Sequence, residues 1–121
     1  MTDSQVMVEG DPVKVAVNPG ICGFTCIVKA WKMKNRQVHI SITCSECKQV
    51  QTLSEILNNL EMSDLFKPVS RTPVFLAAER AACHTSCAIP LVVVKAAEAA
   101  MELALPRDVL IRFQPEELEN Q

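Results

Sequence analysis

Two runs of alternating apolar and polar residues, joined by a short polar turn, constrain the fold of this chain most strongly. In the first run, from 24 to about 33, the even positions Phe24, Cys26, Val28 and Ala30 form an apolar face. Val38, Ile40 and Ile42 continue that parity in the second run. Successive side chains of a strand point to opposite faces, so the pattern predicts a β-hairpin with one buried face. A slip by a single residue would turn every apolar side chain to solvent, so even positions must face even positions.

Two registers of this hairpin satisfy that condition. The first has a three-residue loop and pairs Phe24 with Cys44. It also places Cys22 just beyond the strand end, close to Cys47. The second is shifted by one pair and places Cys26 opposite Cys44. Alternation alone does not choose between them, because both keep the apolar faces together.

Downstream of the hairpin, the pattern changes to that of an amphipathic helix. Thr52 and Glu55 have the spacing of a capping box, in which a threonine hydroxyl and a returning carboxylate satisfy amides at a helix start. Apolar residues follow at i, i+3, i+4 and i+7, which predicts one buried stripe. These apolar residues are Leu53, Ile56, Leu57 and Leu60.

Further elements complete the expected order. Thr72 followed by a proline predicts a second helix start, and Pro90 predicts a third helix. The third helix is apolar around most of its circumference and is therefore expected at the centre of the fold. The alternating segment at 13–17 predicts a first strand, and the largely apolar run at 109–113 predicts a last strand. The order β-β-β-α-α-α-β predicts an α+β fold, with a small mainly antiparallel sheet and helices packed on one face.

Size and composition indicate one folded domain. The chain has 121 residues, of which 49% are hydrophobic, which suits a single domain over 1–121 with mobile tails at 1–11 and 114–121. The net charge is −2 and basic residues do not cluster, which argues against nucleic-acid binding. The N-terminus lacks a signal-peptide pattern, and no apolar run is long enough to span a bilayer. We therefore expect a soluble, cytoplasmic protein that does not bind membranes.

Six cysteines form three closely spaced pairs, and they carry the chemistry of the sequence. The pairs are Cys22-x3-Cys26, Cys44-x2-Cys47 and Cys83-x3-Cys87. In a reducing compartment such spacings are more typical of metal binding or redox chemistry than of structural disulfides. The C-x2-C spacing in particular lets two thiolates turn toward one ion. We interpret Cys26 differently, because it lies on the apolar face of a strand and packs there as a small hydrophobe.

The third pair has a histidine beside it. Cys83 and Cys87 lie on one helix face if the second helix continues, and they flank a short loop if it ends near Cys83. Either geometry lets both sulfurs reach one site. His84 joins that site only if the helix ends there, and a solvated histidine at a helix end is an equal alternative. His39, on the polar face of its strand, is expected to have no special role.

Several short motifs also resemble a known family. They are Cys22-Gly23-Phe24, Cys47 after a strand, and the runs at 84–90, 95–98 and 104–109. Together they resemble a family of small proteins of unknown function, mostly from anaerobic microbes, over about residues 19–113. The resemblance carries no established activity. The positions that match its pattern are Cys22, Cys47, His84 and Cys87, whereas Cys26, Cys44 and Cys83 are additional.

The leading hypothesis is a metal-binding protein. The predicted ligands are Cys22, Cys47, Cys83, His84 and Cys87, with Cys44 possible. Four ligands of this kind suit zinc or an iron–sulfur cluster, and an anaerobic setting would favour iron and sulfide. A closed four-ligand set predicts a structural or electron-transfer role more than an enzyme, because catalytic zinc keeps an open position.

Two other interpretations stay open. One is a thiol–disulfide redox protein that uses Cys44 with Cys47 or Cys83 with Cys87. The other is an accessory or interaction module whose cysteines are buried and inert. The apolar third helix could equally serve a homodimer or a protein partner.

Overall fold

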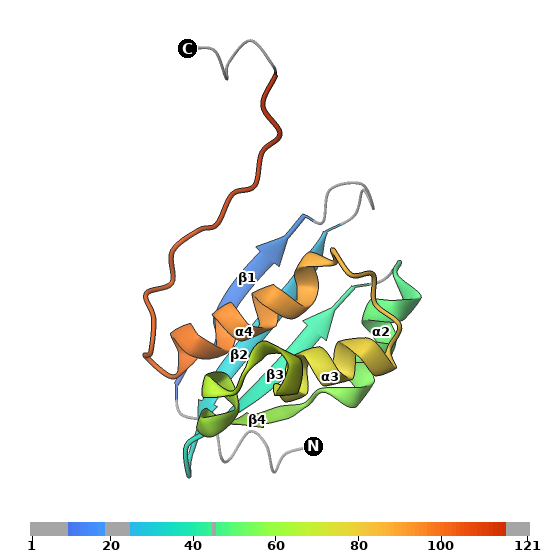
Figure 1. Cartoon of the computed structure of the whole chain (residues 1–121). Coiled ribbons are helices and arrows are strands. Elements are labelled where there is room, and N and C mark those ends of the chain that lie inside the picture. The colour runs from blue at the N-terminus through green and yellow to red at the C-terminus, as the bar shows by residue number, and fades with distance from the viewer. Residues whose placement is uncertain (1–9, 19–24, 45, 116–121) are drawn as a thin grey trace.

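Four strands form one antiparallel sheet in the computed structural model, which describes residues 10–18, 25–44 and 46–115. The strands lie in chain order across the sheet: β1 (Val13–Val17), β2 (Cys26–Met33), β3 (Gln37–Thr43) and β4 (Asn59–Glu61). Figure 1 shows the helices gathered on one face of this sheet. The predicted fold class, α+β with a small antiparallel sheet, is confirmed.

The β2–β3 hairpin adopts the second of the two registers. Val28 pairs with Ile42 and Ala30 with Ile40, so the register that paired Phe24 with Cys44 is wrong. The loop reverses through Asn35 and Arg36, which have φ values of 65° and 60°. Asparagine tolerates this left-handed region, and the Met62 N–H donates to the Arg36 carbonyl oxygen at 2.9 Å. The turn is therefore held in place by the start of a neighbouring element.

One face of the sheet carries the core, as alternation predicted. The apolar even positions of β2 and β3 are buried, and the odd positions of β1 join the same face because Val15 pairs with Val28 and Val17 with Cys26. On β1, Val17 is buried, while Val13 and Val15 are partly buried against the core. The opposite face carries partly exposed residues, where the rings of Trp31 and His39 lie 5.4 Å apart. His39 also hydrogen bonds to Asn59, with 2.7 Å between Nδ1 and Oδ1. This histidine lies on the polar face, where it was expected.

The first helix, α2 (Lys48–Ile56), begins five residues earlier than predicted. Its N-cap is Cys47, so Thr52 and Glu55 lie exposed inside the helix and the predicted capping box is wrong. Val50 extends the buried stripe one turn toward the N-terminus and packs in the core with Leu53. The stripe also ends early. Leu57 is the C-cap, and Leu60 is buried in β4, a short strand that the sequence pattern did not predict.

The other two helices follow their start signals closely. Helix α3 (Pro73–Arg80) has Thr72 as its N-cap and proline in its first turn, as predicted. Helix α4 (Ala88–Ala100) begins two residues before Pro90, because proline fits throughout a first turn where N–H groups have no helical partner. It packs against β1, β2 and β3, so its predicted central position is confirmed. Its buried face is rich in small residues, which allows close approach to the sheet: Ile89, Pro90, Val93, Ala96, Ala97 and Ala100.

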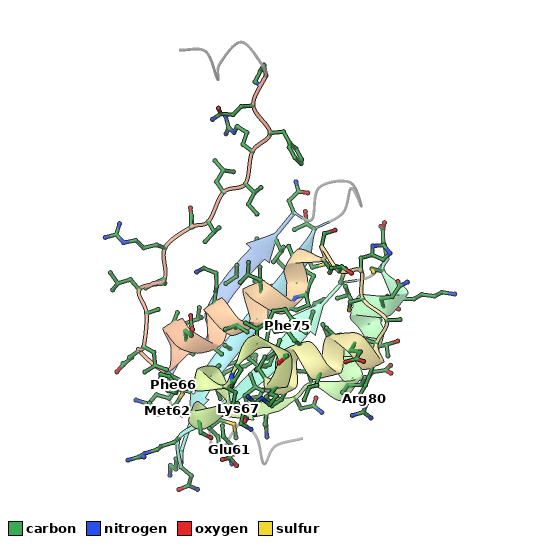
Figure 2. The ribbon with its side chains drawn as sticks, viewed as in Figure 1. Glu61, Met62, Phe66, Lys67, Phe75 and Arg80 are labelled. Atoms are coloured by element: carbon green, nitrogen blue, oxygen red, sulfur yellow. A yellow bond between two sulfur atoms is a disulfide. The ribbon has the colours of Figure 1, made fainter. Side chains whose placement is uncertain are left out.

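Two 3-10 helices, η2 (Met62–Phe66) and η3 (Val69–Arg71), lead from β4 to α3. The Glu61 N–H donates to Asp64 Oδ2 at 2.9 Å, and Lys67 Nζ lies 2.8 Å from Asp64 Oδ1. Burial raises the pKa of Asp64, but the hydrogen bonds from Lys67 and the Glu61 amide, with the Lys67 charge, bring it below its ordinary value. Figure 2 shows Glu61 and Lys67 at the same corner of the molecule.

The last strand, predicted at 109–113, is not formed in the single chain. Helix α4 ends at Ala100, and Glu102 adopts a left-handed conformation with φ 63°. The Leu103 N–H then donates to the Glu98 carbonyl oxygen at 2.8 Å, as in a Schellman motif. Residues 105–115 continue without helix or strand and are exposed throughout. No helix in the described part of the chain combines the length and apolarity needed to cross a membrane.

Candidate thiol site

Among the residues that the structure describes, three free cysteines lie at helix ends. Cys47 is the N-cap of α2, Cys87 is the N-cap of α4, and Cys83 follows the C-terminal end of α3. All three are partly buried and contact the edge of the core. Figure 1 shows the loop that joins α3 to α4 running past the start of α2. Thiols from three separate elements thus gather in one region.

A Schellman motif at the end of α3 positions Cys83. Ala82 adopts a left-handed conformation with φ 60°, and the Cys83 N–H donates to the Ala78 carbonyl oxygen at 3.0 Å. The chain therefore leaves the helix axis immediately before Cys83. Of the two geometries that the sequence left open, the structure has the one in which Cys83 and Cys87 flank a loop.

A tight turn then brings the chain back toward Cys83. The Cys87 N–H donates to the His84 carbonyl oxygen at 3.0 Å, which closes a four-residue reversal. The His84 side chain is exposed, and its backbone carbonyl makes the structural contact. Its proposed role as a ligand therefore stays a prediction.

The Cys83 thiol is affected by its surroundings and by the other two thiols. Burial raises the pKa of Cys83 to about 11, and the neighbouring Cys87 and Cys47 sulfurs and a hydrogen bond with Cys87 add to that effect. The Cys47 thiol itself donates to Gln49 Oε1 at 3.5 Å. Among residues 10–18, 25–44 and 46–115, no three His, Cys, Asp or Glu side chains are arranged closely enough to hold a metal ion. In this arrangement the Cys83 thiol stays protonated at neutral pH.

Two of the three sulfurs lie where a helix favours negative charge. The first N–H groups of a helix have no helical acceptor and carry partial positive charge. Cys47 and Cys87 occupy such positions on α2 and α4, and neither side chain caps its own helix by a hydrogen bond. Thiolates, or a negatively charged thiolate complex, would be stabilised at this pair of helix ends.

A disulfide borders the free thiols. Cys26 and Cys44 are bonded across the end of the β2–β3 hairpin, where their Cα atoms are 4.5 Å apart, the usual spacing of a non-hydrogen-bonded antiparallel pair. Both side chains are buried, and Cys26 is 0% exposed. Cys44 lies three residues before Cys47, and its carbonyl oxygen accepts from Gln51 Nε2 at 3.0 Å. The disulfide and the free thiols therefore share one end of the sheet.

The outcome for the predicted ligands differs from one residue to another. The structure brings together Cys47, Cys83 and Cys87, while Cys22 lies outside the described residues. Cys44, the possible ligand, is bonded to Cys26 instead. The burial predicted for Cys26 is confirmed, but its partner was visible only through the second hairpin register, which placed it opposite Cys44.

Comparison with known proteins adds one finding. Residues 13–113 match the model of a family described as "Family of unknown function (DUF6951)". Neither the curated proteins nor the solved structures gave a match. The matched segment contains every helix and strand described above, together with the free thiols and the disulfide. Because it covers well over half of the 121 residues, the chain belongs to this family of unknown function.

Proposed function

We propose that the protein binds a metal centre through the thiolates of Cys47, Cys83 and Cys87. The observation that carries the proposal is the gathering of these three thiols, from three separate elements, in one region where Cys47 and Cys87 neighbour Cys83. In the described part of the chain the three are not arranged closely enough to hold an ion, so binding would have to draw them together. All three side chains contact the edge of the core and stay partly exposed, so an ion could reach them from solvent. A sulfur-rich set of this kind suits zinc or an iron–sulfur cluster.

The physical argument concerns charge. Burial, and then the neighbouring Cys87 and Cys47 sulfurs, raise the pKa of Cys83, so ionising the third thiol here costs free energy. A bound cation replaces the protons and offsets the repulsion. The amide ends of α2 and α4 then favour the net negative charge that a thiolate complex retains.

A fourth ligand is needed for a closed tetrahedral set. Cys22 is our candidate, as the sequence suggested, because it lies only four residues before Cys26. His84, which adjoins Cys83 and is exposed, is the alternative fourth ligand.

Such a site would serve structure, electron transfer or cofactor handling rather than hydrolysis, because four protein ligands leave no open position. Iron and sulfide would be favoured over zinc if the protein works in the anaerobic setting that the resemblance implied. The protein is accordingly proposed as a metal-binding protein rather than an enzyme.

The test uses cobalt, whose thiolate complexes absorb where the protein alone does not. Reduced, metal-free protein is titrated with Co²⁺ in the absence of oxygen, and we expect thiolate–cobalt absorbance that saturates at about one equivalent. Cys47→Ser, Cys83→Ser and Cys87→Ser should each weaken binding by at least about tenfold, roughly the cost of one lost ligand contact. The control is Cys26→Ala/Cys44→Ala, which removes the disulfide and should keep the absorbance. Equal cobalt binding by Cys87→Ser would exclude this site.

A second candidate, thiol–disulfide exchange, is favoured by one specific observation. The Cys26–Cys44 disulfide lies three residues from the free Cys47. Attack of a Cys47 thiolate on the Cys44 sulfur would form a Cys44–Cys47 bond and release Cys26 as the thiolate, which takes up the proton that Cys47 lost. Alkylation of metal-free protein, followed by peptide mapping, should detect the Cys44–Cys47 bond if this exchange occurs. Finding only Cys26 bonded to Cys44 would argue against it.

A further inference from the structure

The segment after α4 exposes more apolar surface than a stable isolated chain should. The exposed large apolar side chains from 105 onward include Ile111, which is 80% exposed, and Phe113, which is 98% exposed. Figure 2 shows the side chains of this segment standing clear of the body of the molecule. Contiguous exposed apolar residues of this kind mark interaction sites on soluble proteins.

The segment has the pattern of a strand that lacks a partner. Val109, Ile111 and Phe113 alternate with Leu110 and Arg112, so an extended backbone places the first three on one face. The family match extends to residue 113 and therefore includes these five residues in the matched domain. They carry no strand pairing among the described residues.

The sheet offers a matching edge. Among the described residues β1 pairs only with β2, so its other side presents unpaired backbone groups. β1 is five residues long, the length of the 109–113 segment. Its Val13, Val15 and Val17 lie on the core face, and α4 packs across them. An added strand with three apolar side chains on that face would extend the core beside α4.

We propose that a second copy of this chain covers the segment. Residues 109–113 of each copy add as a strand to the outer edge of β1 in the other copy, and the exchange closes a two-fold dimer. The choice of a second copy rests on two observations. The segment leaves α4 through the left-handed Glu102 and stands away from its own sheet, as Figure 1 shows. Each copy also supplies both the apolar segment and the open edge of β1, so one symmetric dimer would bury the segment and pair the edge in both copies.

This dimer is independent of the thiol site and is tested by oligomeric state. The mass of the full chain is measured by light scattering during size-exclusion chromatography, over a range of concentrations and in reductant. We expect a dimer for the wild type. Ile111→Asp should raise the dimer dissociation constant by at least about tenfold, because it puts a charge on the buried face of the added strand. The matched control, Gln114→Asp, adds the same charge just beyond the strand and should leave the dimer intact.

A second variant keeps the test decisive. Phe113→Ser alters a side chain that is 98% exposed in the single chain, so it cannot unfold the monomer by removing a core contact. It should also weaken the dimer without changing the circular dichroism spectrum. A monomeric wild type would overturn the proposal. If hydrogen exchange then showed residues 109–113 protected in that monomer, the segment would be paired within its own chain. A dimer that persists in both Ile111→Asp and Phe113→Ser would overturn it as well, because another surface would then hold the two copies.

Discussion

Removing the Cys26–Cys44 disulfide should destabilise the fold by an amount that its loop length sets. The two residues are 18 apart in sequence, and closing a loop of that size restricts the unfolded chain by about 3 kcal/mol. Unfolding of 121 residues has an entropy of about 0.25 kcal/mol/K, so this loss corresponds to a fall in Tm of about 12 °C. The measurement is urea unfolding of the oxidised protein with and without a phosphine reductant.

Two variants separate the disulfide from other effects of the reductant. Cys26→Ala/Cys44→Ala should unfold at the same urea concentration in both conditions, because the bond is already absent. Cys47→Ser retains the disulfide and should lose about 3 kcal/mol on reduction, as the wild type does. A wild type whose free energy of unfolding does not change on reduction would refute the reasoning, and so would a double variant that stays sensitive to the reductant.

Three further predictions concern the turns and titrating groups. Ala82→Gly should raise the free energy of unfolding by about 1 kcal/mol, because glycine adopts φ near 60° without the strain that alanine carries there. Urea unfolding measures this gain, and its absence would contradict the Schellman geometry before Cys83. Asp64→Asn should lower the free energy of unfolding by about 1 kcal/mol or less at neutral pH, and should not change it at low pH. The reason is that a carboxyl group with a lowered pKa stabilises the fold at pH values above its ordinary pKa of 3.8, and this stabilisation is lost as the pH falls through the folded-state pKa. An equal loss at both pH values would argue against the contact with Lys67. Alkylation of the Cys83 thiol should have its midpoint near pH 11, and the contribution of this thiol to the free energy of unfolding should fall as the pH rises from about 9 to about 11. Alkylation rates resolved by peptide mapping should shift to lower pH in Cys87→Ser. An unchanged midpoint would contradict the effect of Cys87 on Cys83.

Much of the fold follows from side-chain periodicity. Alternation in β2 and β3 identified the hairpin and its buried face, and Thr72 before a proline located the start of α3. The apolar circumference of α4 correctly predicted its central position. These features depend on local sequence, where burial and capping leave a clear pattern.

The errors arose where local patterns were ambiguous. Thr52 and Glu55 had capping-box spacing, but the helix already begins at Cys47, because Val50 adds a buried contact that outweighs the local cap. Leu60 fits a helical stripe equally well, yet it pairs with Val38 in β4. The strand pattern at 109–113 was recognised, but the single chain leaves it unpaired.

The spacing of the cysteines named Cys47, Cys83 and Cys87 as ligands, and the structure places these three thiols near one another. Because no three such side chains of the described residues are arranged closely enough to hold an ion, their role as ligands stays a prediction. The bond between Cys26 and Cys44 required the hairpin register, and a shift by one pair keeps every apolar residue on the same face. Sequence alternation therefore could not identify it.

The most direct test of the central proposal is the metal and acid-labile sulfide content of protein purified without oxygen. We expect either about one zinc per chain or iron accompanied by sulfide, with the content falling sharply in Cys87→Ser and persisting in Cys26→Ala/Cys44→Ala. A wild-type protein without metal, or a Cys87→Ser variant with the same content, would contradict the assignment of Cys47, Cys83 and Cys87 as a metal site.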